Sequence, residues 1–175
     1  MTTTEGNLNW VPAARHTDLL AEPVGAAIEH VSSARVAQIA PDLADTGAFC
    51  EAYGVALDHS ANCVVVAGKR AGETRYAAVM VLAIMRADIN NVVRRHLDVR
   101  KISFAPMDEA VRLTGMEYGG ITPIGLPDGW PILVDEAVLA AGTVVIGSGI
   151  RGSKLLVDAA ELTALPSAEV LKLAS

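Results

Sequence analysis

One loop rich in glycine and proline constrains this chain more than any other segment. The stretch from Gly115 to Pro127 holds four glycines and two prolines, and it lies between a helix signal and a strand signal. Glycine permits positive φ and a close approach of a ligand to the main chain, while proline fixes its neighbours. The loop is therefore predicted to hold backbone N–H groups rigidly around one point.

Apolar periodicity and end signals predict short helices and more numerous strands. Strands are expected over 63–67, 76–85, 101–105, 131–134, 143–146, 154–157 and 169–173, and helices over 45–53, 88–97, 106–114, 136–141 and 159–165. The first two strands are apolar almost throughout, which predicts burial on both faces. The pattern indicates an α+β domain with a mixed central sheet covered by short helices.

The regular pattern starts near residue 41. Residues 1–40 are weakly patterned, with an irregular arm around Trp10 and a short helix over 23–31. A chain of 175 residues has the size of one ordinary domain. We therefore expect a single globular domain, with residues 41–175 as its main part and residues 1–40 as an N-terminal arm and short helix.

Composition and charge exclude several classes of protein. Hydrophobic residues make up 51% of the chain and charged residues 19%, which excludes a disordered chain. The longest apolar run, 76–85, is far shorter than the roughly twenty residues of a membrane-spanning helix. The first residues form neither a basic leader nor an apolar signal segment, so a cytoplasmic location is expected. A net charge of -6 argues against a protein that wraps a long stretch of nucleic acid, and no DNA partner is expected.

Three elements in order resemble the YbaK/ProX (YbaK/EbsC) family of aminoacyl-tRNA editing domains, which includes the editing insertion of bacterial prolyl-tRNA synthetases. They are the Gly-x-x-x-Pro element from Gly119 to Pro123, the Val134-Asp135-Glu136 step and the Gly147-Ser148-Gly149 turn. Their order and spacing across a whole domain make the signal moderately strong. The resemblance runs from about Tyr53 to the apolar C-terminal segment, and it implies that the sheet curls into a partly closed barrel.

The resemblance implies hydrolysis of the ester that joins a wrong amino acid to tRNA. Backbone N–H groups of the loop would stabilise the negative charge that develops on the carbonyl oxygen. Asp135 is expected to bind the substrate, to orient the attacking water, or to cap the helix that begins at Glu136, and these roles are compatible. The catalytic residues expected on this basis are Gly119, Gly120, Ile121, Thr122, Pro123 and Asp135.

The same resemblance places the substrate-binding residues on two strands and the second glycine turn. They are expected to be Asn62, Cys63, Gly147, Ser148, Gly149 and Lys154. His59 is added because it is the histidine that lies just before the pocket strand. Active relatives usually carry a lysine at the position of Asn62, so a charged contact with the tRNA end is missing there. Lys154 is the candidate cation in its place. The hydroxyls of Thr122 and Ser148 can serve the substrate or cap the turns.

Cys63 is interpreted as a packing residue, because no histidine is fixed beside it by sequence to activate a thiol. No spacing of histidine, cysteine or acidic residues proposes a metal site, and no cofactor is expected.

Three functions remain open at this point. The first is a freestanding deacylase that clears a small mischarged amino acid from tRNA; the second is a non-catalytic module that binds a nucleotide, an amino acid or a tRNA end. The third is a hydrolase of another small ester that uses Cys63. The expected partner is the tRNA acceptor end with its terminal adenosine, without a membrane, and a homodimer stays open. One methylene in a pocket is worth only about 1–3 kcal/mol, so the sequence does not identify the amino acid.

Overall fold

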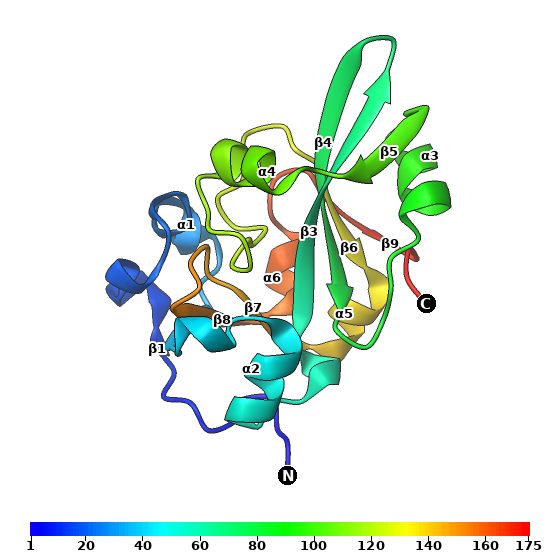
Figure 1. Cartoon of the computed structure of the whole chain (residues 1–175). Coiled ribbons are helices and arrows are strands. Elements are labelled where there is room, and N and C mark those ends of the chain that lie inside the picture. Colours follow the sequence, from blue (N-terminus) through cyan, green and yellow to red (C-terminus); the bar gives the residue numbers. More distant parts are fainter.

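A long antiparallel hairpin of strands β3 (Ala61–Arg70) and β4 (Glu73–Leu82) forms the centre of the fold in a computed structural model that describes residues 1–175 (Figure 1). Strand β5 (Lys101–Phe104) pairs antiparallel with β3. Strands β6 (Ile132–Asp135) and β9 (Ala168–Leu171) continue the sheet in parallel beyond β4, in the order β5-β3-β4-β6-β9. The α+β class with a mixed sheet is thereby confirmed.

A second sheet of four antiparallel strands packs against the first. Its order is β1 (Val11–Pro12), β2 (Arg35–Gln38), β8 (Ser153–Asp158) and β7 (Thr143–Gly147). The sequence predicts β7 and β8 but not their separation from the central sheet, because strand pairing depends on residues far apart in the chain. One isolated bridge between Ser60 and Val145 links the sheets, which otherwise do not close into a barrel.

Short helices connect the strands, and local signals set their ends. Gly54 and Gly115 follow two of the helices with φ of 67° and 69°, a left-handed conformation that suits glycine. The helices are α1 (Glu22–Ala27), α2 (Thr46–Tyr53), α3 (Arg94–His96), α4 (Met107–Thr114), α5 (Glu136–Ala141) and α6 (Ala159–Thr163). Single 3-10 turns lie at Ala13–Arg15, Thr17–Leu19, Ile28–His30, Pro41–Leu43 and Leu57–His59.

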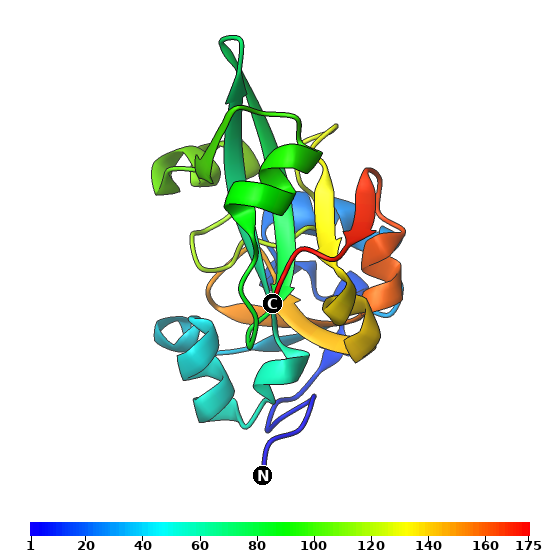
Figure 2. The ribbon, with the colours of Figure 1, turned by 90° about the vertical axis from the view of Figure 1, so that its right-hand side faces the viewer.

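The segment 88–97 differs from the regular helix that its periodicity predicts. Asp88 caps it as expected, because its carboxylate accepts a hydrogen bond from the N–H of Asn91. The turn that follows, Ile89–Val93, is π-helical, and only Arg94–His96 is α-helical. Figure 2 shows this segment lying across the outer face of the β3–β4 hairpin. Val93, at the end of this wider turn, is buried in the apolar cluster on that face.

The first forty residues are built into the fold. Strand β2 pairs with β8, and β1 pairs with β2, so this segment completes the second sheet. Val24, Ile28 and Val36 are buried in the largest apolar cluster. The irregular arm expected around Trp10 therefore contains a short strand and a 3-10 turn.

The core is aliphatic, and it fills both faces of the central hairpin. The largest cluster lies between the two sheets and joins Met80 of β4 to Leu155 of β8. A second cluster lies on the opposite face, where Val66 and Val79 meet Val93. Burial of β3 and β4 on both faces, as predicted, fixes the hairpin as the frame from which a site can be built. None of the helices has the length and apolarity that a membrane span requires.

Candidate functional site

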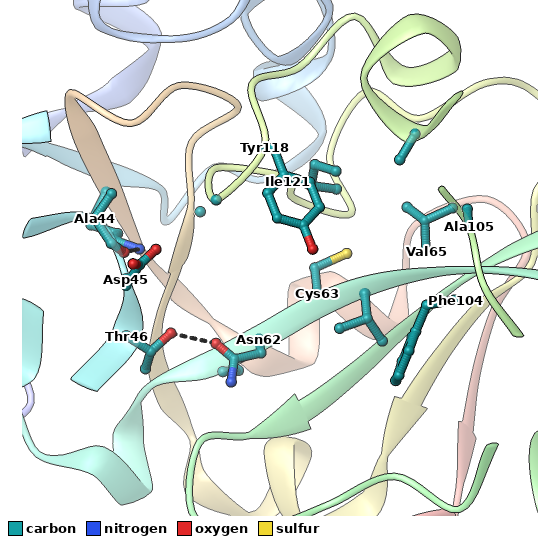
Figure 3. A pocket seen from close by; sticks show the side chains of 16 residues that line it. Ala44, Asp45, Thr46, Asn62, Cys63, Val65, Phe104, Ala105, Tyr118 and Ile121 are labelled. Atoms are coloured by element: carbon teal, nitrogen blue, oxygen red, sulfur yellow. Dashed lines mark hydrogen bonds between the residues drawn. The ribbon is translucent and has the colours of Figure 1, made fainter. Parts of the chain in front are cut away.

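A pocket of about 280 Å³ opens beside the first half of β3 (Figure 3). The glycine loop, the start of α2 and the start of β8 form its other walls. Ten of its lining residues are apolar, and the polar ones sit mainly on the α2 side. The lining consists of Ala44, Asp45, Thr46, Ala61, Asn62, Cys63, Val64, Val65, Phe104, Ala105, Ala110, Tyr118, Gly119, Ile121, Gly147 and Lys154.

The two glycine turns predicted from the sequence lock together behind this pocket. The N–H of Gly149 donates to the carbonyl oxygen of Gly120 over 2.6 Å. A Cβ atom added at Gly120 would lie 2.7 Å from the carbonyl oxygen of Ile150, and one added at Gly147 would lie 2.5 Å from that of Gly120. No side chain fits at this crossing. Glycine is thus required here by the close approach of two backbones.

Residues 21–24 hold both turns from behind. A Cβ atom at Gly149 would meet the Cβ of Ala21 at 2.4 Å, and one at Gly125 would meet the carbonyl oxygen of Pro23 at 2.3 Å. The N–H of Ala21 also donates to the carbonyl oxygen of Ser148 over 3.3 Å. The N-terminal segment is therefore part of the wall that positions the loop.

Three pocket-lining residues of the glycine loop have a backbone N–H group without a protein acceptor. The N–H of Gly120 donates to the carbonyl oxygen of Glu117, but those of Tyr118, Gly119 and Ile121 donate to no protein oxygen. Gly119 and Ile121 both line the pocket, whereas Gly120, Thr122 and Pro123 lie behind it. Gly119 has φ of 91°, a conformation that glycine adopts without strain.

Thr122 has an unusual environment. Its side chain is fully buried, and its hydroxyl is the one buried side-chain polar group without a hydrogen-bond partner. Thr122 does not line the pocket, so its hydroxyl does not make the contact with a substrate that was expected of it.

Lys154 brings a positive charge to the pocket from β8. Its side chain is only 7% exposed, its Nζ donates to the carbonyl oxygen of Ala44 over 2.8 Å, and it lies 5.2 Å from the centroid of the Phe49 ring. Its pKa is lowered to about 8, mainly by burial; Cys50 and Asp45 act in the opposite direction, and Arg151 adds to the lowering. The amine is therefore still mostly protonated at neutral pH.

Asn62 and Cys63 line the pocket beside this cation. The hydroxyl of Thr46 donates to the Asn62 side-chain oxygen over 2.5 Å, which leaves the amide N–H₂ group of Asn62 as a donor (Figure 3). Burial raises the pKa of the Cys63 thiol to about 12, and no histidine lines the pocket. The thiol is therefore protonated at neutral pH and lacks an activating base, in accord with a packing role.

Several residues expected at the site lie outside the pocket. The Asp135 side chain is buried and accepts hydrogen bonds from the N–H groups of Ala137, Leu173 and Ala174, so the helix cap is the role seen here. A ring nitrogen of His59 lies 3.0 Å from the carbonyl oxygen of Thr143.

Ser148 and Gly149 also lie behind the pocket. The Ser148 hydroxyl serves its own turn, through the carbonyl oxygens of Ile150 and Ser153. Gly149 packs on α1.

Other lining residues were missed from the sequence. Thr46, Phe104 and Tyr118 come from α2, β5 and the loop, and Tyr118 and Phe104 are 52% and 63% exposed at the rim. Arg151 bonds to Asp45 over 3.4 Å and to the carbonyl oxygen of Tyr118 over 3.3 Å. Tyr118 adjoins Gly119 and was within reach of sequence reasoning; Thr46 and Phe104 carry no local signal.

A comparison with protein families identifies the class of domain to which this fold and pocket belong. Residues 40–165 match the family model of the aminoacyl-tRNA editing domain, and the protein belongs to this family. A stretch of 71 residues is 41% identical to the proline–tRNA ligase of Lactobacillus gasseri; it covers 39% of this chain but only 13% of the ligase.

Solved structures show the same fold. A candidate trans-editing enzyme for prolyl-tRNA synthetase superposes with a TM-score of 0.72 at 23% identity, over 95% of this chain and 99% of that one. A hypothetical protein superposes with a TM-score of 0.77 at 22% identity, over 88% of this chain and 100% of that one.

Proposed function

We propose that the protein is a trans-acting deacylase that hydrolyses the ester between a small mischarged amino acid and tRNA. Membership of the editing-domain family supports the substrate class. The observation that carries the proposal is the run of unpartnered N–H groups of Tyr118, Gly119 and Ile121 at the pocket wall. Water attacks the ester carbonyl carbon, the bond to the ribose oxygen breaks, and the free amino acid and tRNA leave.

Two kinds of donor in the pocket suit the charge that develops in this reaction. A preorganised backbone N–H aimed at the carbonyl oxygen is worth on the order of 3 kcal/mol in acyl transfer. Lys154 adds a desolvated positive charge, which acts more strongly than a charge in water. We expect Gly119 and Ile121 to bind the oxyanion, and Lys154 and the amide of Asn62 to bind the polar groups around the ester.

The size of the pocket favours a small amino acid. A volume of about 280 Å³ lies just below the range of ligand pockets, which span roughly 300–1,000 Å³. The apolar lining suits a short aliphatic side chain. The one lining carboxylate, Asp45, is exposed and bonded to Arg151. We therefore expect the ribose hydroxyl next to the ester to assist the water.

The test is a panel of tRNAs mischarged with alanine, serine, cysteine or a larger residue. We expect faster deacylation with the purified protein than in buffer, greatest for one small amino acid. Lys154→Gln should lower kcat/KM on the order of tenfold or more. The matched control Lys172→Gln, which removes an exposed lysine, should leave kcat/KM unchanged. If the wild-type protein deacylates no member of the panel, this function is wrong.

A non-catalytic binding module is the second candidate, favoured by the uncharged Asn62 held by Thr46. It would bind the tRNA end tightly without turnover, so the same panel separates the two. The thiol hydrolase is disfavoured by the raised pKa of Cys63.

A further inference from the structure

The end of the β3–β4 hairpin carries a concentration of positive charge in a chain whose net charge is -6. The hairpin projects beyond the rest of the molecule (Figure 1). The end of β3, the start of β4, the start of β5 and the residue before β5 contribute the cations, which are Lys69, Arg70, Arg75, Lys101 and Arg100.

Two of these cations are engaged on the side of the hairpin that faces away from the pocket. Arg70 forms an ion pair with Asp98, and Arg75 donates to the carbonyl oxygens of Leu97 and Asp98. Both arginines thus tie the hairpin to the segment before β5, which accounts for them structurally.

The two lysines have no such partner. Lys69 and Lys101 lie directly opposite each other across β3 and β5, both are exposed, and neither forms an ion pair. Like charges that face each other across a strand pair destabilise a sheet. The fold therefore gives no reason for placing two lysines opposite each other. An anionic ligand bound between them would give one, because it would offset their repulsion.

Strand alternation places this lysine pair on the same face of β3 as the pocket. Side chains two apart along a strand share a face, so Lys69 follows Cys63, Val65 and Ala67. A groove of about 440 Å³ occupies this face, and Lys69, Lys101, Thr74 and Ser103 contribute to it, with Glu109 as its one acidic residue. Lys69 lies four residues beyond Val65, or about 13 Å along the strand.

We propose that Lys69 and Lys101 bind the phosphodiester backbone of the tRNA acceptor strand a few nucleotides before the end that enters the pocket. The inference rests on the proposed function for the position of that end. A strand that leaves the pocket along this face reaches two lysines that carry no other charge partner. Contacts of this kind position the backbone without reading sequence.

The test uses an uncharged RNA minihelix that carries the acceptor stem and its single-stranded 3′ end. The groove variant is Lys69→Gln with Lys101→Gln. The control variant is Arg86→Gln with Lys172→Gln, which removes the same charge from exposed positions outside both the pocket and the groove. Dissociation constants are measured by titration at several salt concentrations.

We expect the groove variant to bind on the order of tenfold more weakly at low salt, with a salt dependence shallower by about one to two counterions. The control should bind within about twofold of wild type. Thermal melting should show the groove variant no less stable, because it relieves a like-charge pair. The inference is overturned if the groove variant binds the minihelix as tightly as wild type does. It is also overturned if the control variant loses as much affinity as the groove variant.

Hydrolysis of two substrates separates this inference from the proposed function. The charged minihelix has the stem, and an aminoacyl-adenosine ester lacks it. We expect the groove variant to hydrolyse the small ester like wild type and the minihelix more slowly. Equal hydrolysis of both substrates by wild type and variant would refute the phosphate contact alone. If wild type hydrolyses neither, the deacylase function is wrong, while the minihelix titration still decides the binding surface.

Discussion

Replacing Lys154 by methionine is expected to make the protein more stable and less active. Methionine has a similar length and fills the same space without a charge. Lowering the lysine pKa from 10.5 to about 8 means that the folded state disfavours its charged form by about 3 kcal/mol. Methionine loses the hydrogen bond to Ala44 and the contact with Phe49, together about 1–2 kcal/mol. The net gain at pH 7 is about 1–2 kcal/mol.

The sign of the pH dependence follows from the same values. Below pH 8 the lysine is protonated in both the folded and unfolded states, so the full penalty is present at pH 7. Between pH 8 and 10.5 the folded protein loses the proton first, and wild type gains stability relative to the variant until the penalty is gone. Urea unfolding at pH 7 and pH 10 measures the difference. Lys172→Met, at an exposed site, should show no such pH dependence. A methionine variant less stable than wild type at pH 7, or a difference independent of pH, would refute the reasoning.

Three further predictions concern the rest of the site. Cys63→Ser should change the deacylation rate less than tenfold, because burial raises the thiol pKa to about 12; a larger loss with a trapped acyl-thioester on wild type would identify a nucleophile. Gly120→Ala should lower the free energy of unfolding by about 2 kcal/mol or more, because its Cβ would lie 2.7 Å from Ile150. Gly47→Ala should not lower it, because a Cβ atom there meets nothing within 4 Å. Equal urea midpoints for the two variants would contradict this prediction. Asp135→Ala should cost about 2–4 kcal/mol of stability, because three N–H groups lose their acceptor; a fall in kcat/KM of the folded protein would instead place Asp135 in the reaction.

Local signals predicted much of the fold. Glycines that end helices, such as Gly54 and Gly115, and the cap at Asp135 act within a few residues, so the sequence displays them. Strand β2 was missed, because its four residues become a strand by pairing with β8 more than a hundred positions later. The division between two sheets was hidden for the same reason.

The pocket was predictable only where its residues adjoin a motif. Gly119, Ile121 and Gly147 belong to the glycine turns, and Asn62 was reached through the family resemblance. Phe104 comes from a distant strand and was missed for that reason. The distinction between Gly119 and Gly120 depends on which N–H group is already bonded, which is a property of the folded backbone.

The support that residues 21–24 give to both glycine turns has an evolutionary consequence. This segment lies before the residues that match the editing-domain family, yet Ala21 and Pro23 leave no space at Gly149 and Gly125. A substitution there shifts the pocket wall without altering any residue that touches a substrate. Because one methylene of discrimination is worth only about 1–3 kcal/mol, a small displacement of this wall is enough to change it. Under the proposed function, two homologues with identical pocket linings can therefore diverge in the amino acid they prefer through changes outside the family's shared region.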